Sequence, residues 1–203
     1  MPRPRSLTSE QIATAALSVL DRDGLDGLSM RALAQELGMG TMSLYRYVSD
    51  RGQVEELVVD LVLGAVDTEA PRGAAAKRLT VLADRVRVAV SGHPAVVPLL
   101  LVHRHSSPSS RRWGEAVLTV LTDAGLTGKP RVIAFRAVLS QVFGALQVAH
   151  FGPLSGPGTA ALAELPAEEF PLLSETAARA RAVAPEEEFR KGFEIVLRGL
   201  GIS

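Results

Sequence analysis

The sequence predicts an all-α protein, in which a small N-terminal three-helix domain precedes a larger helical domain. Three observations point to this class: apolar residues recur three and four positions apart, helix-start signals are frequent, and the alternating pattern of strands is scarce. The 203 residues, 47% of them hydrophobic, are enough to bury a core without cross-links. The chain has no cysteine, which excludes disulfides and thiolate metal sites.

Local signals predict four helices before residue 66. The stretch Thr8–Gln11 has the form of a capping box, in which two side chains each satisfy the other residue's backbone N–H. Gly24 lies where the first helix is expected to end. The signals for the next three helices are a cap at Ser29, a stop at Gly38, a periodic stretch over 41–47 and a cap at Asp50.

The rest of the chain also follows a helical pattern, which brings the expected total to nine or ten helices. Residues 69–76 have the composition of a linker. A long helix is expected from Lys129 to Phe151, and a last helix is expected to start at Pro185. The other expected elements are a buried segment over 95–102, a helix through Trp113, a Gly/Pro loop over 152–158 and a helix over 168–183.

The stretch 29–48, SMRALAQELGMGTMSLYRYV, has the spacing of two short helices that cross at a steep angle. Ala34 is small where the helices must approach, and Gly38 supplies the tight turn four residues later. A second helix mounted in this way can enter the major groove of DNA, which is ~12 Å wide. Tyr45 and Tyr47 cannot both face the core of so short a helix, which favours a binding role over simple packing.

Several arginines near this stretch are suited to contacts with DNA. Arg46 can pair with guanine, while Arg31 and Arg51 can hold the backbone on either side. Arg3 and Arg5 form a short basic arm that can reach the minor groove. The chain is neutral, however, with 22 basic and 22 acidic residues, and residues 1–63 carry six arginines, no lysine and nine acids. Binding must therefore depend on the placement of a few side chains.

Motifs over residues 12–63 resemble the tetracycline-repressor (TetR) family of transcriptional regulators. The most specific are Ala-Ala-Leu before Asp21, GLDGLS at 24–29, LAQELG at 33–38 and SLYRYV at 43–48, with a weaker likeness around 151–153 and 168–173. The resemblance implies an all-helical homodimer with a DNA-binding domain over 6–66 and a ligand-binding and dimerisation domain over 67–203. The helix-turn-helix would span 29–48, and a helix at about 50–66 would connect ligand binding to DNA binding.

The resemblance also implies which residues contact double-stranded operator DNA: Met30, Arg31, Thr41, Met42, Ser43, Tyr45, Arg46, Tyr47 and Arg51. The helices over about 131–151 and 186–200 carry enough apolar residues to pair with their copies in a four-helix homodimer interface. A small molecule of unknown identity is expected to bind beside them. The candidate ligand residues, for each of which core packing is an equally good interpretation, are Leu100, His103, Trp113, Gln141 and Gln147.

Other function classes find weaker support in the sequence. His103 and His105 are two residues apart but have few carboxylates nearby, so no metal or cofactor is expected. No Gly-x-Ser-x-Gly or phosphate-loop motif is present, so an enzyme is not expected. No secretory signal is visible and the uncharged stretches 88–103 and 137–163 do not fit a spanning helix, which favours a cytoplasmic protein without membrane contact.

The hypothesis is a repressor that a ligand releases from a palindromic operator. Two alternatives stay open: a helical ligand-binding protein or enzyme that has lost DNA binding, and a protein-interaction adaptor.

Overall fold

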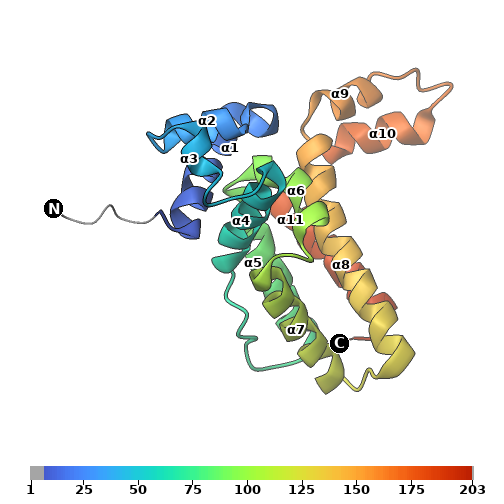
Figure 1. Cartoon of the computed structure of the whole chain (residues 1–203). Helices are drawn as coiled ribbons and strands as arrows, with labels where there is room; N and C mark the ends of the chain where they lie inside the picture. Colours follow the sequence, from blue (N-terminus) through green and yellow to red (C-terminus); the bar gives the residue numbers. More distant parts are fainter. Residues whose placement is uncertain (1–6, 203) are drawn as a thin grey trace. The chain divides into compact units, whose positions relative to one another are not determined.

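The computed structural model describes residues 7–202, and within that range the chain forms helices and no strand (Figure 1). The all-α prediction is confirmed. Contacts divide the chain into two compact units: the residues up to Glu69 together with Arg85–Ala116, and Ala70–Asp84 together with Val117–Ser203. The predicted domain boundary at residues 66 and 67 stays a prediction.

The first unit is built around the N-terminal helices. Its complete helices are α1 (Ser9–Gly27), α2 (Met30–Glu36), α3 (Thr41–Leu44), α4 (Arg51–Gly64), the 3₁₀ helix η1 (Pro94–Val96) and α6 (Val97–His103). The second unit holds α8 (Gly128–Phe151), α9 (Pro157–Ala163), α10 (Pro171–Ala180) and α11 (Pro185–Gly199). Each unit also takes part of α5 (Ala75–Ser91) and of α7 (Pro108–Asp123).

The predicted helix caps are present. Gln11 N–H donates to the Thr8 hydroxyl at 3.2 Å, and Thr8 N–H donates to the Gln11 side chain at 3.0 Å, which completes the capping box. Ser29 and Asp50 accept from backbone N–H groups at the starts of α2 and α4. The helical geometry of α1 breaks at Gly24, whose φ of 73° favours glycine.

The core of the first unit lies where α1 packs against α4, and where α4 also contacts α6. Three residues of α1 that are fully buried, Ala16, Val19 and Leu20, face this core. From α4, Val54, Val58 and Val59 are buried to the same degree. Burial of such apolar side chains fixes α4 against both the N-terminal helices and the segment that follows the linker.

The second unit is held by the contact between α8 and α11. Phe189 and Phe193 of α11 stack with their ring centroids 6.4 Å apart, and Phe193 is fully buried. A methyl group added at Gly192 would lie 2.9 Å from the Gln141 amide nitrogen, so the two helices approach closely there. The short helices α9 and α10 pack against each other.

Three expected elements differ from the structure. The third helix is confined to Thr41–Leu44, because its backbone tightens into turns over 45–47. The expected Gly/Pro loop over 152–158 ends early, since Pro157 occupies the first turn of α9, a position that tolerates proline. The expected helix over 168–183 is shortened to α10, which Pro171 begins.

Helix α8 also corrects an expectation about membranes. The helix begins at Gly128, before the uncharged stretch from 137, and is long and apolar enough to span a bilayer, with a mean hydropathy of 1.6. Of its most apolar 18-residue window, 28% is buried, including Val138 and Val142. Length and composition alone therefore do not assign this helix to a membrane.

Candidate functional site

The predicted helix-turn-helix forms, and its turn has the expected chemistry. Gly38 has a φ of 65°, which favours glycine, and Met39 N–H donates to the Ala34 carbonyl at 2.9 Å. Leu33, Ala34 and Leu44 are at most 1% exposed, so α2 and α3 are held together by buried apolar side chains. This packing fixes the direction in which α3 presents its other side chains.

The outer side of α3 and of the turns after it carries the predicted DNA-contact residues. Met42 is 82% exposed, and Tyr45 and Tyr47 are 47% and 36% exposed. The expectation that the two tyrosines do not both face the core is therefore confirmed. The remaining six of the nine predicted residues are exposed or half-buried: Met30, Arg31, Thr41, Ser43, Arg46 and Arg51. Arg3 and Arg5, the expected basic arm, lie outside the described residues.

Most polar side chains of this surface have no partner within residues 7–202. The guanidinium groups of Arg31 and Arg46 form no ion pair there, and the hydroxyls of Tyr45, Thr41 and Ser43 form no hydrogen bond. Arg22, by contrast, is paired with both Asp23 and Glu36 at 3.0 Å. Exposed cations and hydroxyls without a partner in the protein are the groups that contact phosphates and base edges.

Arg51 differs from the other predicted contacts because it is already held. Its Nε donates to Glu55 Oε1 at 2.7 Å, and its Nη2 donates to the Leu25 carbonyl at 3.1 Å. Its side chain is still 44% exposed. The structure therefore fixes the orientation of this guanidinium and leaves part of it open to solvent.

Three acidic residues of the N-terminal helices bind the segment 93–109, which runs from the residue before η1 into the first turn of α7. Asp21 Oδ2 lies 2.7 Å from His93 Nδ1, and Glu55 Oε2 lies 2.9 Å from His103 Nε2. Asp60 accepts from Ser107 Oγ at 2.7 Å and from Ser109 N–H at 2.8 Å. These contacts account for part of the acidic excess in the N-terminal region, and the excess was the one sequence signal that could have led to them.

The Asp60 carboxylate acts as a cap for α7. Partial burial would raise the pKa of Asp60, but the hydrogen bonds from Ser109 and Ser107 and the charge of Arg112 outweigh it and lower that pKa. Ser109 N–H belongs to the first turn of α7, where backbone donors have no partner within the helix. A charged acceptor there stabilises the start of α7 and ties it to α4.

The five predicted ligand residues fall in both units. Leu100, His103 and Trp113 belong to the first unit and are 1%, 8% and 2% exposed. Gln141 and Gln147 are half-buried residues of α8 in the second unit. All five stay predicted ligand residues.

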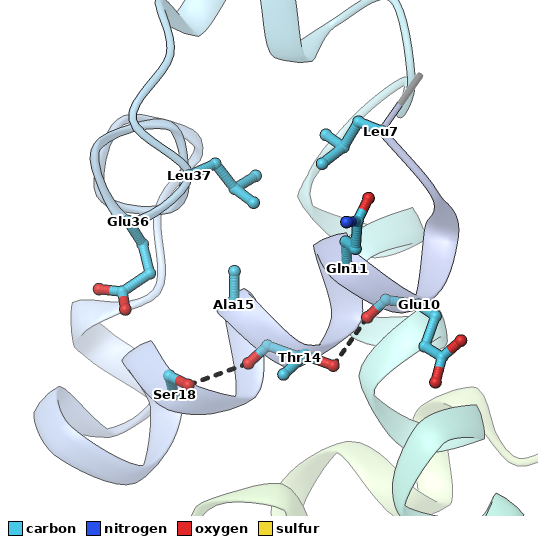
Figure 2. A pocket seen from close by; sticks show the side chains of 8 residues that line it. All are labelled: Leu7, Glu10, Gln11, Thr14, Ala15, Ser18, Glu36 and Leu37. Atoms are coloured by element: carbon cyan, nitrogen blue, oxygen red, sulfur yellow. Dashed lines mark hydrogen bonds between the residues drawn. The ribbon is translucent and has the colours of Figure 1, made fainter. Parts of the chain in front are cut away.

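Two cavities of the first unit lie elsewhere. One, of about 600 Å³, lies between α1 and the end of α2, and the side chains of Leu7 and Leu37 point toward each other across it (Figure 2). The hydroxyls that line it, those of Thr14 and Ser18, already donate to backbone carbonyls at 2.8 and 3.1 Å. The other, of about 480 Å³, is lined by residues of α1, α4 and the start of α7. Neither is lined by a predicted DNA or ligand residue.

Comparison with known families supports the same interpretation of the site. Residues 12–53 match the model of the bacterial regulatory proteins of the tetR family, and residues 68–202 match the tetracyclin repressor-like C-terminal domain. The chain belongs to the tetR family of bacterial regulatory proteins. The resemblance seen in the motifs over 12–63 is thus confirmed, and it extends over the second part of the chain.

Individual relatives agree with this assignment. The HTH-type transcriptional repressor DrrR1 of Streptomyces coeruleorubidus is 36% identical over 71% of this chain, and the class D tetracycline repressor of Escherichia coli is 28% identical over 97%. These matches cover 54% of DrrR1 and 90% of the class D repressor. The chain also matches an HTH-type transcriptional regulator of Saccharopolyspora erythraea, over 57% of that protein's length. The chain therefore spans just over half the length of DrrR1 and of this regulator.

Solved structures show the same architecture. ActR, a TetR family protein of Streptomyces coelicolor crystallised with (S)-DNPA, superposes with a TM-score of 0.81 at 29% identity over 96% of each chain. ActR has also been crystallised with actinorhodin, with a TM-score of 0.79. The helical fold and its N-terminal helix-turn-helix are therefore those of the tetR family.

Proposed function

We propose that this protein is a ligand-responsive repressor that binds a palindromic operator as a homodimer, acts in the cytoplasm and performs no catalysis. The observation that carries the proposal is a set of exposed polar side chains on and after α3, above all Arg46 and Tyr45, that have no partner in the described part of the chain. Family membership supports it, because members of this family are bacterial regulatory proteins.

The proposed mode of DNA binding places α3 in the major groove. Its single turn carries Thr41 and Ser43, whose hydroxyls can bind phosphate. Arg46 lies in the turn that follows the helix, two residues after its end. A bidentate arginine–guanine pair contributes about 1–3 kcal/mol of discrimination between bases. Because the N-terminal region is acidic, binding relies on such directed contacts more than on a general positive field.

The proposed dimer forms through α8 and α11. Each helix buries one face in its own unit, yet α8 leaves Val132, Ile133 and Val148 more than half exposed, and α11 leaves Ile195 61% exposed. A second copy of the same two helices would cover these residues in a four-helix arrangement. The two α3 helices would then be spaced to read two half-sites about one helical turn of DNA apart.

The proposed ligand response uses α4. This helix begins at Arg51 beside the DNA-contact residues and continues to residues that contact α6. A small molecule bound near Leu100, His103, Trp113, Gln141 or Gln147 would favour a position of α4 that spoils the half-site spacing. The structures of ActR with two small molecules support this class of ligand response.

A selection of bound fragments from random duplex DNA at moderate salt tests the proposal. We expect a palindromic site with turn-related half-sites, and a loss of about tenfold or more in affinity for it on Arg46→Ala. Arg111→Ala is the matched control, because Arg111 is exposed and unpaired among the described residues but lies on α7.

Two results would count against the proposal. Recovery of no fragment above background would favour a ligand-binding protein that has kept the fold without the DNA function. An unchanged affinity for Arg46→Ala would show that this arginine does not read the site.

A further inference from the structure

Arg51, the first residue of α4, is held by two hydrogen bonds from its guanidinium. Its Nε–H donates to Glu55, and one Nη2–H donates to the Leu25 carbonyl. The Nη1 atom has no partner among residues 7–202. The guanidinium is planar, so two bonds along one edge fix the direction of the other edge.

The carboxylate that holds Arg51 is itself held from the far side. Oε1 of Glu55 accepts from Arg51, while Oε2 lies 2.9 Å from Nε2 of His103, the last residue of α6. An ionised carboxylate can only accept, so Nε2 of His103 carries the hydrogen. The Glu55 and His103 side chains are only 15% and 10% exposed, which protects this bond from competition by water.

This arrangement limits the freedom of a flexible side chain. A glutamate has three rotatable bonds, so ordering such a side chain costs conformational entropy. The hydrogen bond from His103 keeps Glu55 in the conformation in which only one oxygen meets Arg51. Without it, the carboxylate can turn both oxygens toward Nε and Nη2, which is the favoured two-bond arginine–carboxylate geometry. Such a pair would displace the Leu25 carbonyl, so the direction in which Nη1 points would no longer be fixed.

We infer that His103 is a positioning residue for DNA binding, which acts through Glu55 to keep the Nη1 edge of Arg51 available to a DNA phosphate. The inference rests on the proposed function, in which Arg51 contacts the operator backbone. His103 does not touch DNA in this scheme. The connection runs from α6 through two hydrogen bonds to the start of α4, so a displacement of α6 would change the presentation of Arg51.

The test uses the full chain and the operator recovered by selection, with affinities measured over a series of salt concentrations. We expect His103→Leu to weaken binding about 3- to 10-fold and to reduce the slope of log K against log salt by about 0.9, the loss of one phosphate contact. His103→Gln retains an N–H donor and should restore most of both. Arg51→Ala should lower both values to a similar extent, and the double variant should lose little more.

His93→Leu is the matched control, because His93 also pairs with an acid of the N-terminal helices, Asp21, but has no connection to Arg51. It should leave the salt slope unchanged. Circular dichroism of each variant checks that it is folded.

The outcomes separate this inference from the proposal on which it rests. If Arg51→Ala leaves affinity and slope unchanged, Arg51 does not contact phosphate, and both the contact and the inference are wrong. If Arg51→Ala reduces the slope but His103→Leu does not, or if the two losses simply add, only the positioning role of His103 is overturned.

Discussion

Replacing the Asp60 carboxylate tests the proposed connection between α4 and α7. Asp60→Ala removes the acceptor for Ser109 N–H and for the Ser107 hydroxyl, which lie 2.8 and 2.7 Å from it. Loss of a helix-capping acceptor typically costs about 1 kcal/mol, and a bond to a charged group about 1.5–3 kcal/mol. Because Asp60 is only partly buried, water replaces some of this loss, and we expect the free energy of unfolding to fall by about 1–2 kcal/mol.

Urea denaturation at a fixed protein concentration measures this effect, since association would otherwise shift the midpoint. Trp113 is the only tryptophan of the chain, is 2% exposed and lies on α7, so its fluorescence reports on the helix that Asp60 caps. In thermal denaturation the same change corresponds to about 3–6 °C for a chain of this size. Asp60→Asn keeps an oxygen acceptor without the charge and should lose about half as much.

Asp26→Ala is the control, because Asp26 is exposed and forms no hydrogen bond or ion pair among the described residues. If Asp60→Ala is no more destabilising than Asp26→Ala, the carboxylate does not stabilise the start of α7. The pH dependence gives a second check. Folding lowers the pKa of Asp60 from its ordinary value of 3.8, so the stabilisation is complete above that value and is lost as the pH falls through the lowered one.

Three other substitutions test the core, the turn and the proposed dimer. Phe193→Ala should lower the free energy of unfolding by about 3–5 kcal/mol in urea denaturation, because Phe193 is fully buried where α11 packs on α8; a loss below 1 kcal/mol would contradict that packing. Gly38→Ala should lower the melting temperature because its φ is 65°, whereas Gly158→Ala, with open space around it, should not. Ile195→Glu should convert the dimer to monomer in analytical ultracentrifugation, whereas the comparably exposed Val88→Glu should not; a dimer that survives would place the interface elsewhere.

The sequence was most informative where a structural signal is local. The caps at Thr8, Ser29 and Asp50 were predicted correctly, because each is satisfied by a backbone N–H only three residues away. The turn at Gly38 was also predicted correctly, since a tight turn needs the positive φ of this glycine whatever surrounds it. The length of α3 was predicted less well, because packing decides the extent of a single helical turn as much as helix propensity does.

The sequence by itself determined the helical class and the helix-turn-helix, because these follow from spacings within about 20 residues. The nine candidate DNA contacts followed from the family resemblance of the same stretch and stay predictions. The tertiary structure alone decided which acidic side chains form hydrogen bonds, and with which partners. Asp21 and His93 are 72 positions apart, and Glu55 and His103 are 48 apart. No local pattern connects such residues, since their approach depends on how α1, α4 and α6 pack. The structure thereby distinguished Arg31 and Arg46, which have no ion-pair partner among residues 7–202, from Arg51, which Glu55 holds.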